Sequence, residues 1–197
     1  GFEIQRSRRI VNSGHGQLDE GQFSQQQQIF AVEGACPVLR RQAIDNIRID
    51  GQFIDPEYFW YGDDLDFAWR MTIFGWHQIL APSVIAFHDR QTTKTTRTSW
   101  RDFIALRRVI PMKKRQLDWK NVRFTIIRND YIMNILKDLP YILRREISLL
   151  GYLAIYEFPV FLEIFSLLKR LPKLLHQRRK IMAKAVISAR EFRKFIH

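Results

Sequence analysis

A chain of 197 residues, 46% of them hydrophobic, is long enough to bury one good core. Its net charge of +12 is unevenly distributed: residues 1–90 carry eight Lys/Arg against twelve Asp/Glu, and residues 91–197 carry twenty-four against eight. The single cysteine, Cys36, excludes a disulfide framework and a thiolate metal cluster, and it fits a reducing, cytoplasmic setting. The charge asymmetry predicts two regions with different roles, the second facing an anionic partner such as nucleic acid or a membrane surface.

Short elements and turns alternate in the first part of the chain. Residues 4–11 favour a strand, and residues 13–16, SGHG, are typical of a turn. Residues 29–39 indicate a buried strand interrupted by glycine and proline. Residues 40–47 favour a short helix, and the Asp-Gly pair at 50–51 predicts a turn after it.

The apolar positions of residues 65–73 recur at helical spacing, and Gly75 is placed to end this helix. Residues 77–88, HQILAPSVIAFH, then favour one or two strands with a break at Pro82. Because strand and helix alternate up to this point, we expect an α/β layer rather than a helical bundle. Residues 89–99, rich in threonine, indicate a loop or linker.

From Trp100 onward the sequence predicts helices throughout. Prolines recur at intervals of helix length, and Pro140 and Pro172 suit the first turns of new helices. Residues 188–191, SARE, have the capping-box pattern of a serine followed three positions later by a glutamate, which predicts a last helix.

Three carboxylates, Asp63, Asp64 and Asp66, lie together in the stretch YGDDLDFAWR at the start of the predicted helix. Carboxylates in a first helical turn are stabilised by free N–H groups and the helix dipole, by ~0.3–1 kcal/mol each, so the cluster could simply cap the helix. The alternative is chemistry, because a helix start at the edge of an α/β layer lies where ligands collect, and a general base needs such a cleft. Like charges raise a pKa whereas the dipole lowers it, so the residues alone leave both interpretations open.

His88 is a second notable residue, because it follows the apolar run SVIAF and precedes the polar linker. A single histidine at a strand end is usually a surface residue. A metal site there would need carboxylates from elsewhere in the protein.

Two stretches carry a resemblance to a known family: VEGACPVLRRQAI at residues 32–44 and GQFIDPEYFWYGDDLDFAWRMTIFGWHQILAPSVIAFH at residues 51–88. Their shared order is a Gly-Ala turn with a following Arg-Arg, an aromatic run, an acidic pair with a third Asp, Trp-Arg, Gly-Trp, and a strand ending in His. This order resembles the acceptor-side half of a family 2 glycosyltransferase, and it is most similar to bacterial rhamnosyltransferase-like members. The resemblance covers residues 3–100 clearly and the helical part loosely.

The resemblance implies an α/β fold of the GT-A type, with residues 1–98 as the acceptor-side part of the catalytic domain and residues 99–197 as a basic helical tail. It implies an inverting transferase that moves a sugar, such as rhamnose, from a nucleotide-sugar donor. The acceptor would be a glycan or a lipid-linked sugar in cell-surface polysaccharide synthesis.

On the matching positions, the resemblance implies that Asp64 is the catalytic base and takes the proton from an acceptor hydroxyl. Asp63 stands where the family more often has Glu, so it would be the supporting neighbour of Asp64. His88 matches the family's metal ligand, and a Mg²⁺ or Mn²⁺ ion there would neutralise the leaving diphosphate. The further substrate-binding candidates are Gly34, Ala35, Asp66, Arg70, Arg90 and Lys94.

Several of these candidates also have a simple structural interpretation. Asp66 would be structural or would orient the neighbouring loop, and Arg70 could pair with the acids or be a solvated helix residue. Arg90, Lys94 and Arg97 could contact the donor phosphates or form a solvated basic linker.

The family's donor half is missing. No Asp-x-Asp follows an apolar strand, and the Asp-Leu-Asp of residues 64–66 opens a helix instead. The chain begins with Gly1 and shows no signal-peptide pattern. We therefore expect a fragment or a truncated gene product, which binds a donor poorly because the metal lacks its carboxylate partners.

Residues 147–168 form an apolar stretch of sufficient length to span a membrane, for which ~20 residues suffice. Glu157, Pro159 and Glu163 within it disfavour a simple span, because each charge costs ~2.5–3.5 kcal/mol near the centre. Residues 169–184 add seven cations and no acid, which favours a peripheral position at the cytoplasmic face of an anionic membrane.

Other interpretations of this tail remain. Its apolar faces could pack on each other and on the α/β layer as a helical subdomain. The whole chain could also be a non-catalytic membrane-surface module whose acids only cap a helix. Nucleic acid fits the charge, but no recognisable binding module is present, so we expect no nucleic-acid partner.

Overall fold

The structure of the chain is a computed structural model that describes residues 1–87 and 100–197. Within these residues the strands are short and form two separate antiparallel pairs, β1 (Phe2–Ile4) with β2 (Ile10–Asn12) and β3 (Gln27–Ile29) with β4 (Gln78–Leu80). No larger sheet joins these described strands, and the α/β fold of the GT-A type remains a prediction.

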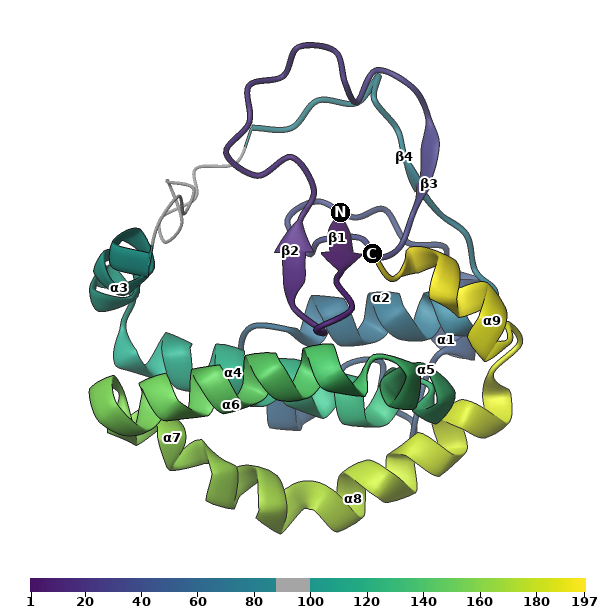
Figure 1. The fold of residues 1–197 in the computed structure, drawn as a ribbon. Coiled ribbons are helices and arrows are strands. Elements are labelled where there is room, and N and C mark those ends of the chain that lie inside the picture. The colour runs from purple at the N-terminus through teal and green to yellow at the C-terminus, as the bar shows by residue number, and fades with distance from the viewer. Residues whose placement is uncertain (88–99) are drawn as a thin grey trace.

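Helices make up most of the described chain (Figure 1). They are α1 (Arg41–Asn46), the 3-10 helix η1 (Pro56–Tyr58), α2 (Asp63–Ile73), α3 (Trp100–Val109), α4 (Met112–Asn129), α5 (Ile132–Lys137), α6 (Leu139–Tyr156), α7 (Phe158–Phe161), α8 (Glu163–Lys184), α9 (Ala189–Phe192) and the 3-10 helix η2 (Arg193–Phe195). The long helix α4 packs on both α2 and α8, so it joins the N-terminal part of the chain to the basic C-terminal part.

Several local predictions are confirmed. Helix α2 ends before Gly75, whose φ of +85° suits a left-handed residue, and the N–H groups of Gly75 and Trp76 bond the carbonyls of Thr72 (3.0 Å) and Met71 (2.9 Å). Pro140 lies in the first turn of α6. The predicted capping box of residues 188–191 opens α9.

Other local predictions are wrong. Residues 4–11 hold the end of β1, a connection and the start of β2 rather than one strand, and β3 ends where residues 29–39 begin. Residues 83–87 form no strand, and their apolar side chains are exposed. Pro172 lies inside α8 instead of starting a helix. Because proline has no N–H to bond the preceding turn, it accounts for the bend of α8 that is visible in Figure 1.

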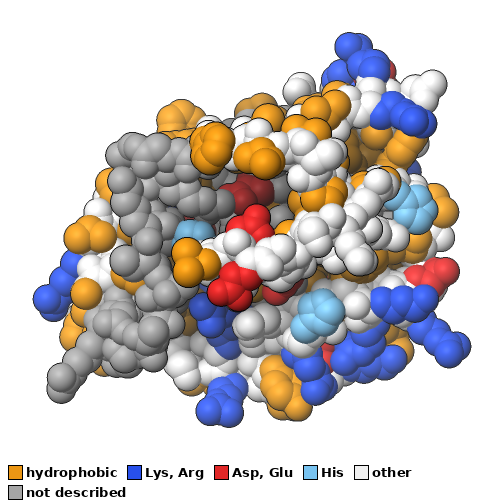
Figure 2. Space-filling model, turned by 90° about the horizontal axis from the view of Figure 1, so that it is seen from above, with side chains coloured by type: hydrophobic (Ala, Val, Ile, Leu, Met, Phe, Trp, Pro, Cys, Tyr) orange, Lys and Arg blue, Asp and Glu red, His pale blue; other side chains and the backbone are white. Residues whose placement is uncertain are grey.

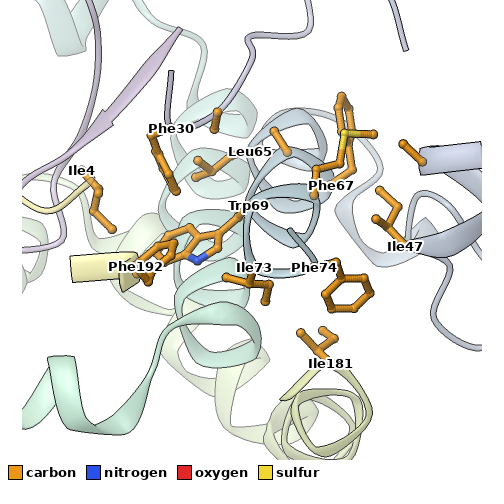
Figure 3. Packing of buried hydrophobic residues seen from close by; sticks show 14 of the residues in the cluster. Ile4, Phe30, Ile47, Leu65, Phe67, Trp69, Ile73, Phe74, Ile181 and Phe192 are labelled. Carbon is orange, nitrogen blue, oxygen red and sulfur yellow. The ribbon is translucent and has the colours of Figure 1, made fainter. Parts of the chain in front are cut away.

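The main hydrophobic core is built around Trp69 of α2 (Figure 3). The Trp69 ring stacks on Phe192 of α9 with centroids 5.5 Å apart and planes 11° apart, and Phe30 meets both rings edge-on at 5.2 and 5.7 Å. Ile181 of α8 packs into the same cluster. One core therefore contains residues from both sides of the expected boundary at residue 98.

A second apolar cluster fills the space between α4, α6 and α7 and includes Trp119, Leu153 and Val160. Glu157, which the sequence placed inside an apolar stretch, is buried and pairs with Arg107 (2.5 Å) and Arg115 (3.1 Å). Among the described helices, none is both long and apolar enough to cross a membrane.

Candidate functional site

The acid pair lies where a tight turn enters α2. Gly62 precedes the helix with a left-handed φ of +77°, and Asp63 and Asp64 are the first two helical residues. The Asn121 side chain of α4 holds the chain before this turn, because its Nδ2 donates to the carbonyls of Tyr58 (2.9 Å), Trp60 (2.9 Å) and Tyr61 (2.6 Å). The position of the acids is therefore set by α4 as well as by their own helix.

The structure brings Asp64 together with Gly34, thirty residues earlier in the chain. The Gly34 N–H donates to Oδ2 of Asp64 at 2.9 Å, and the Leu65 N–H donates to Oδ1 at 2.8 Å. A Cβ atom on Gly34 would lie 3.0 Å from Cβ and 3.1 Å from Oδ2 of Asp64, tighter than ordinary contact. The glycine of the Gly-Ala motif thus allows the close approach that orients the carboxylate.

The surroundings of Asp64 change its acidity. Burial raises the pKa of Asp64, the two N–H bonds from Gly34 and Leu65 lower it, and the negative charges of Asp63 and Glu33 raise it further. The net effect is a raised pKa. A carboxylate in this setting holds a proton more readily than an exposed aspartate, as a general base needs to do.

Asp66 lies on the opposite, buried side of the helix start. It accepts hydrogen bonds from the Tyr58 hydroxyl (3.1 Å), the Asn129 amide (2.9 Å) and Arg70 (2.9 Å), and Arg128 lies 3.7 Å away. Burial raises the pKa of Asp66, but Arg128, Arg70 and the Asn129 bond outweigh it, so the pKa is lowered.

Asp66 and Arg70 therefore have structural contacts, since each residue is only 1% exposed. Arg70 also donates to the carbonyls of Ile47 and Phe53, which joins α2 to the segment before η1. Of the two interpretations of each residue, the structural role of Asp66 and the pairing of Arg70 with an acid match these contacts. Neither charged group is open to a ligand in this conformation.

The other candidates fall into two groups. Ala35 is exposed beside Gly34, and Asp63 is partly exposed beside Asp64, so both border the acid site. His88, Arg90 and Lys94 lie outside the described residues.

The metal prediction cannot be built from the described part of the chain. No group of three or more His, Cys, Asp or Glu side chains lies close enough there to hold a metal ion. The residues at the acid site therefore do not by themselves fit a Mg²⁺ or Mn²⁺ site.

Acidic side chains, red in Figure 2, gather near the middle of the face shown there, and hydrophobic side chains lie beside them. A separate pocket of about 560 Å³ lies between η1, α4 and α8, and Lys113 and Lys120 are among its lining residues. Neither this pocket nor the role of Asn121 could be predicted from the sequence, because both depend on contacts between segments distant in the chain.

Comparisons of the chain with protein-family models, curated proteins and solved structures found no match. The resemblance to family 2 glycosyltransferases therefore stays a prediction from the motifs.

Proposed function

We propose that this chain is the acceptor-side part of an inverting glycosyltransferase with Asp64 as its general base. In the reaction, the acceptor hydroxyl oxygen forms a bond to the anomeric carbon of a nucleotide-sugar, and the bond from that carbon to the diphosphate oxygen breaks. The hydroxyl proton passes to Asp64, and the nucleotide diphosphate leaves.

The observation that carries the proposal is the setting of Asp64 itself. Its carboxylate is oriented by the Gly34 N–H, stands at a helix start and has a raised pKa. Asp63 contributes through its negative charge, which adds to the pKa of its neighbour. A residue that only caps a helix does not require a contact with a distant glycine, so the contact with Gly34 favours a catalytic role of Asp64 over capping alone.

The test is the substitution Asp64→Asn in the full-length protein. Asn keeps the size of the side chain and removes the proton acceptor, so sugar transfer falls by about 10²–10⁴-fold while circular dichroism stays unchanged and the melting midpoint does not fall. The matched control is Asp45→Asn, which removes an exposed acid of α1 and leaves transfer intact. Unchanged turnover in the Asp64 variant would remove Asp64 as the base.

A peripheral position on an anionic membrane is the second part of the proposal, and it is also the whole function if the chain is non-catalytic. The observation that favours it is a set of large apolar side chains exposed along α5 to α8. They are Ile132, Met133, Leu136, Leu139, Tyr141, Leu143, Ile147, Ile155, Tyr156, Phe158, Leu162, Phe165, Leu168 and Leu175. Exposed lysines and arginines such as Lys137, Arg144 and Lys169 lie among them, and such a mixture suits an interface of anionic headgroups and acyl chains.

Co-sedimentation of the chain with phosphatidylglycerol-containing vesicles tests this position. The double substitution Phe165→Ser and Leu168→Ser removes two exposed apolar groups of α8 and weakens binding. Val38→Ser, which changes an exposed residue of the N-terminal part, leaves binding unchanged. Three outcomes contradict the interfacial position: equal sedimentation of the wild type and both variants, no sedimentation at all, and sedimentation that added salt does not weaken.

A further inference from the structure

The pocket between η1, α4 and α8 is lined by more basic than acidic side chains. Lys113 and Lys120 come from α4, Arg170 and Lys173 come from α8, and the carboxylates Asp55 and Glu57 belong to the η1 turn. Lys113 and Lys120 lie seven residues apart on one helix, which places them on the same face.

Both carboxylates are already engaged. Asp55 accepts from the Gln177 amide (2.9 Å) and the Glu57 N–H (3.0 Å), and Lys173 lies 3.5 Å away. Glu57 pairs with Arg170 at 2.5 Å and with Lys173 at 3.5 Å. Asp55 also pairs with Arg128 of α4 at 3.4 Å, so both carboxylates are engaged by other cations, and in the described residues neither forms an ion pair with Lys113 or Lys120.

Lys120 is the unusual residue of the pocket. It is only 9% exposed, and in the described part of the chain it has no hydrogen bond and no ion pair; its ammonium lies 5.4 Å from the centre of the Phe124 ring. Burial lowers the pKa of Lys120, Glu163 opposes this, and the charges of Arg170 and Lys113 lower it further. Partial desolvation of an ammonium that has no counter-ion is unfavourable, and an anion in the pocket would relieve that cost.

We propose that this pocket binds the phosphate group of a ligand, with Lys120 and Lys113 as the neutralising cations. The pocket has two more cations than carboxylates, which matches a phosphate charge of about −1.5 to −2 at neutral pH. Its volume of about 560 Å³ is that of a small-ligand site.

The apolar surroundings indicate what could be attached to the phosphate. Leu117 lines the pocket between the two lysines of α4, and Phe59, which is 80% exposed, stands at its edge. Leu117 is only 3% exposed, so a phosphate carrying a hydrocarbon chain would contact the Phe59 ring as well as the lysines, whereas a soluble phosphate would use the lysines alone. The proposal does not depend on Asp64, because neither Asp63 nor Asp64 lines this pocket.

Titration calorimetry of the chain tests the site with two probes, inorganic pyrophosphate and geranyl diphosphate, at constant ionic strength. Saturable binding of either probe is expected. The substitution Lys120→Met keeps the length of the side chain and removes its charge, and we expect about a tenfold or larger loss of affinity. Lys194→Met, a change of an exposed lysine on η2, serves as the matched control and keeps the affinity.

The stability of the variants separates binding from folding. Among the described residues Lys120 has no hydrogen bond or ion pair to lose, and a methionine can keep the contact with the Phe124 ring, so Lys120→Met melts at the same temperature as the wild type or higher. Lys113→Met changes an exposed side chain and gives a second variant with weakened binding should the first one misfold. Tighter binding of geranyl diphosphate than of pyrophosphate identifies a lipid phosphate, and equal binding identifies a soluble one. Absence of saturable binding, or equal affinity in both pocket variants and the wild type, overturns the proposal.

Discussion

Three neighbouring aspartates of α2 differ because their surroundings differ. Asp64 has two backbone N–H donors and two nearby acids, whereas Asp66 lies between Arg70 and Arg128. The sequence predicted that the acids open a helix and that Arg70 could pair with one. It could not predict the burial of Asp66, because Arg128 belongs to α4, a distant segment.

The raised pKa of Asp64 makes a prediction about stability. The folded chain binds the proton of Asp64 more tightly than the unfolded chain does. The stabilisation that this proton gives is therefore fully present below the ordinary aspartate pKa and is lost as pH rises through the folded pKa. Asp64→Asn, which cannot ionise, is therefore expected to be more stable than the wild type at pH 7. Urea unfolding at pH 7 and pH 3 measures this, and the difference should shrink at pH 3. A difference that is the same at both pH values contradicts the raised pKa.

The lowered pKa of Asp138 predicts a pH dependence of stability opposite to that of Asp64. Burial raises its pKa, but hydrogen bonds from Arg193, Arg8 and Arg6 hold it well below the usual range. This contribution is present above the ordinary aspartate pKa and is lost as pH falls through the folded pKa. Asp138→Asn leaves buried Arg8 with one carboxylate fewer and should cost about 3–5 kcal/mol at pH 7 by urea unfolding. A cost below 1 kcal/mol would show that Asp130, the other partner of Arg8, is sufficient.

Gly34→Ala tests the contact that orients Asp64. The added Cβ meets Asp64 at 3.0 Å, so the carboxylate has to move and the N–H bond weakens. We expect a cost of about 1–3 kcal/mol in urea unfolding and a further rise of the Asp64 pKa, measured by carboxyl NMR titration. If the pKa stays the same, the Gly34 N–H is not what holds the carboxylate.

At the scale of helices and strands, local sequence predicts where a helix begins or ends better than it predicts what happens inside the helix. Gly75, Pro140 and the Ser188 capping box were predictable because each acts on its own turn. Pro172 was not, because α8 continues through it with Leu174, Gln177 and Ile181 buried against the rest of the molecule. Strand β4 lies within residues 77–88, where the sequence predicted a strand, whereas β3 was missed because its partner β4 belongs to a distant segment.

Gly75, which follows α2, and Gly151, which lies inside α6, are expected to respond oppositely to alanine. Gly75 has φ of +85°, so Gly75→Ala should cost about 1–2 kcal/mol in urea unfolding although Val186 leaves room for the methyl group. Gly151 lies inside α6 with no atom within 4 Å of an added Cβ, so Gly151→Ala should gain about 0.5–1 kcal/mol. Changes of the same sign in both variants would show that packing, and not backbone conformation, determines how alanine changes the free energy of unfolding.

At the scale of the whole molecule, the acidic and basic parts of the sequence do not fold around separate cores. Composition and charge predicted two regions, but charge reports on the surface and says little about which apolar faces meet inside. The contacts of Trp69 with Phe192 join residues that no local pattern relates.

Phe192→Ala measures how much α9 contributes to this common core. The ring is fully buried against Trp69 and Phe30, so its removal should cost about 3–5 kcal/mol in urea unfolding. Phe87→Ala removes the same ring from a position that is 99% exposed and should change stability by less than about 0.5 kcal/mol. A small effect at Phe192 would mean that the core is stable without α9.

The closing of the core by α9 and η2 also has a consequence for the order of folding. Ile4 pairs with Ile196, and the His197 N–H donates to the Ile4 carbonyl at 3.0 Å, so residues far apart in the sequence lie side by side. Until these segments meet, Phe30 and Trp69 lack the Phe192 ring that covers them, and contacts between such distant residues form slowly. A partly folded chain therefore exposes aromatic surface, which chaperones can bind until these distant contacts have formed.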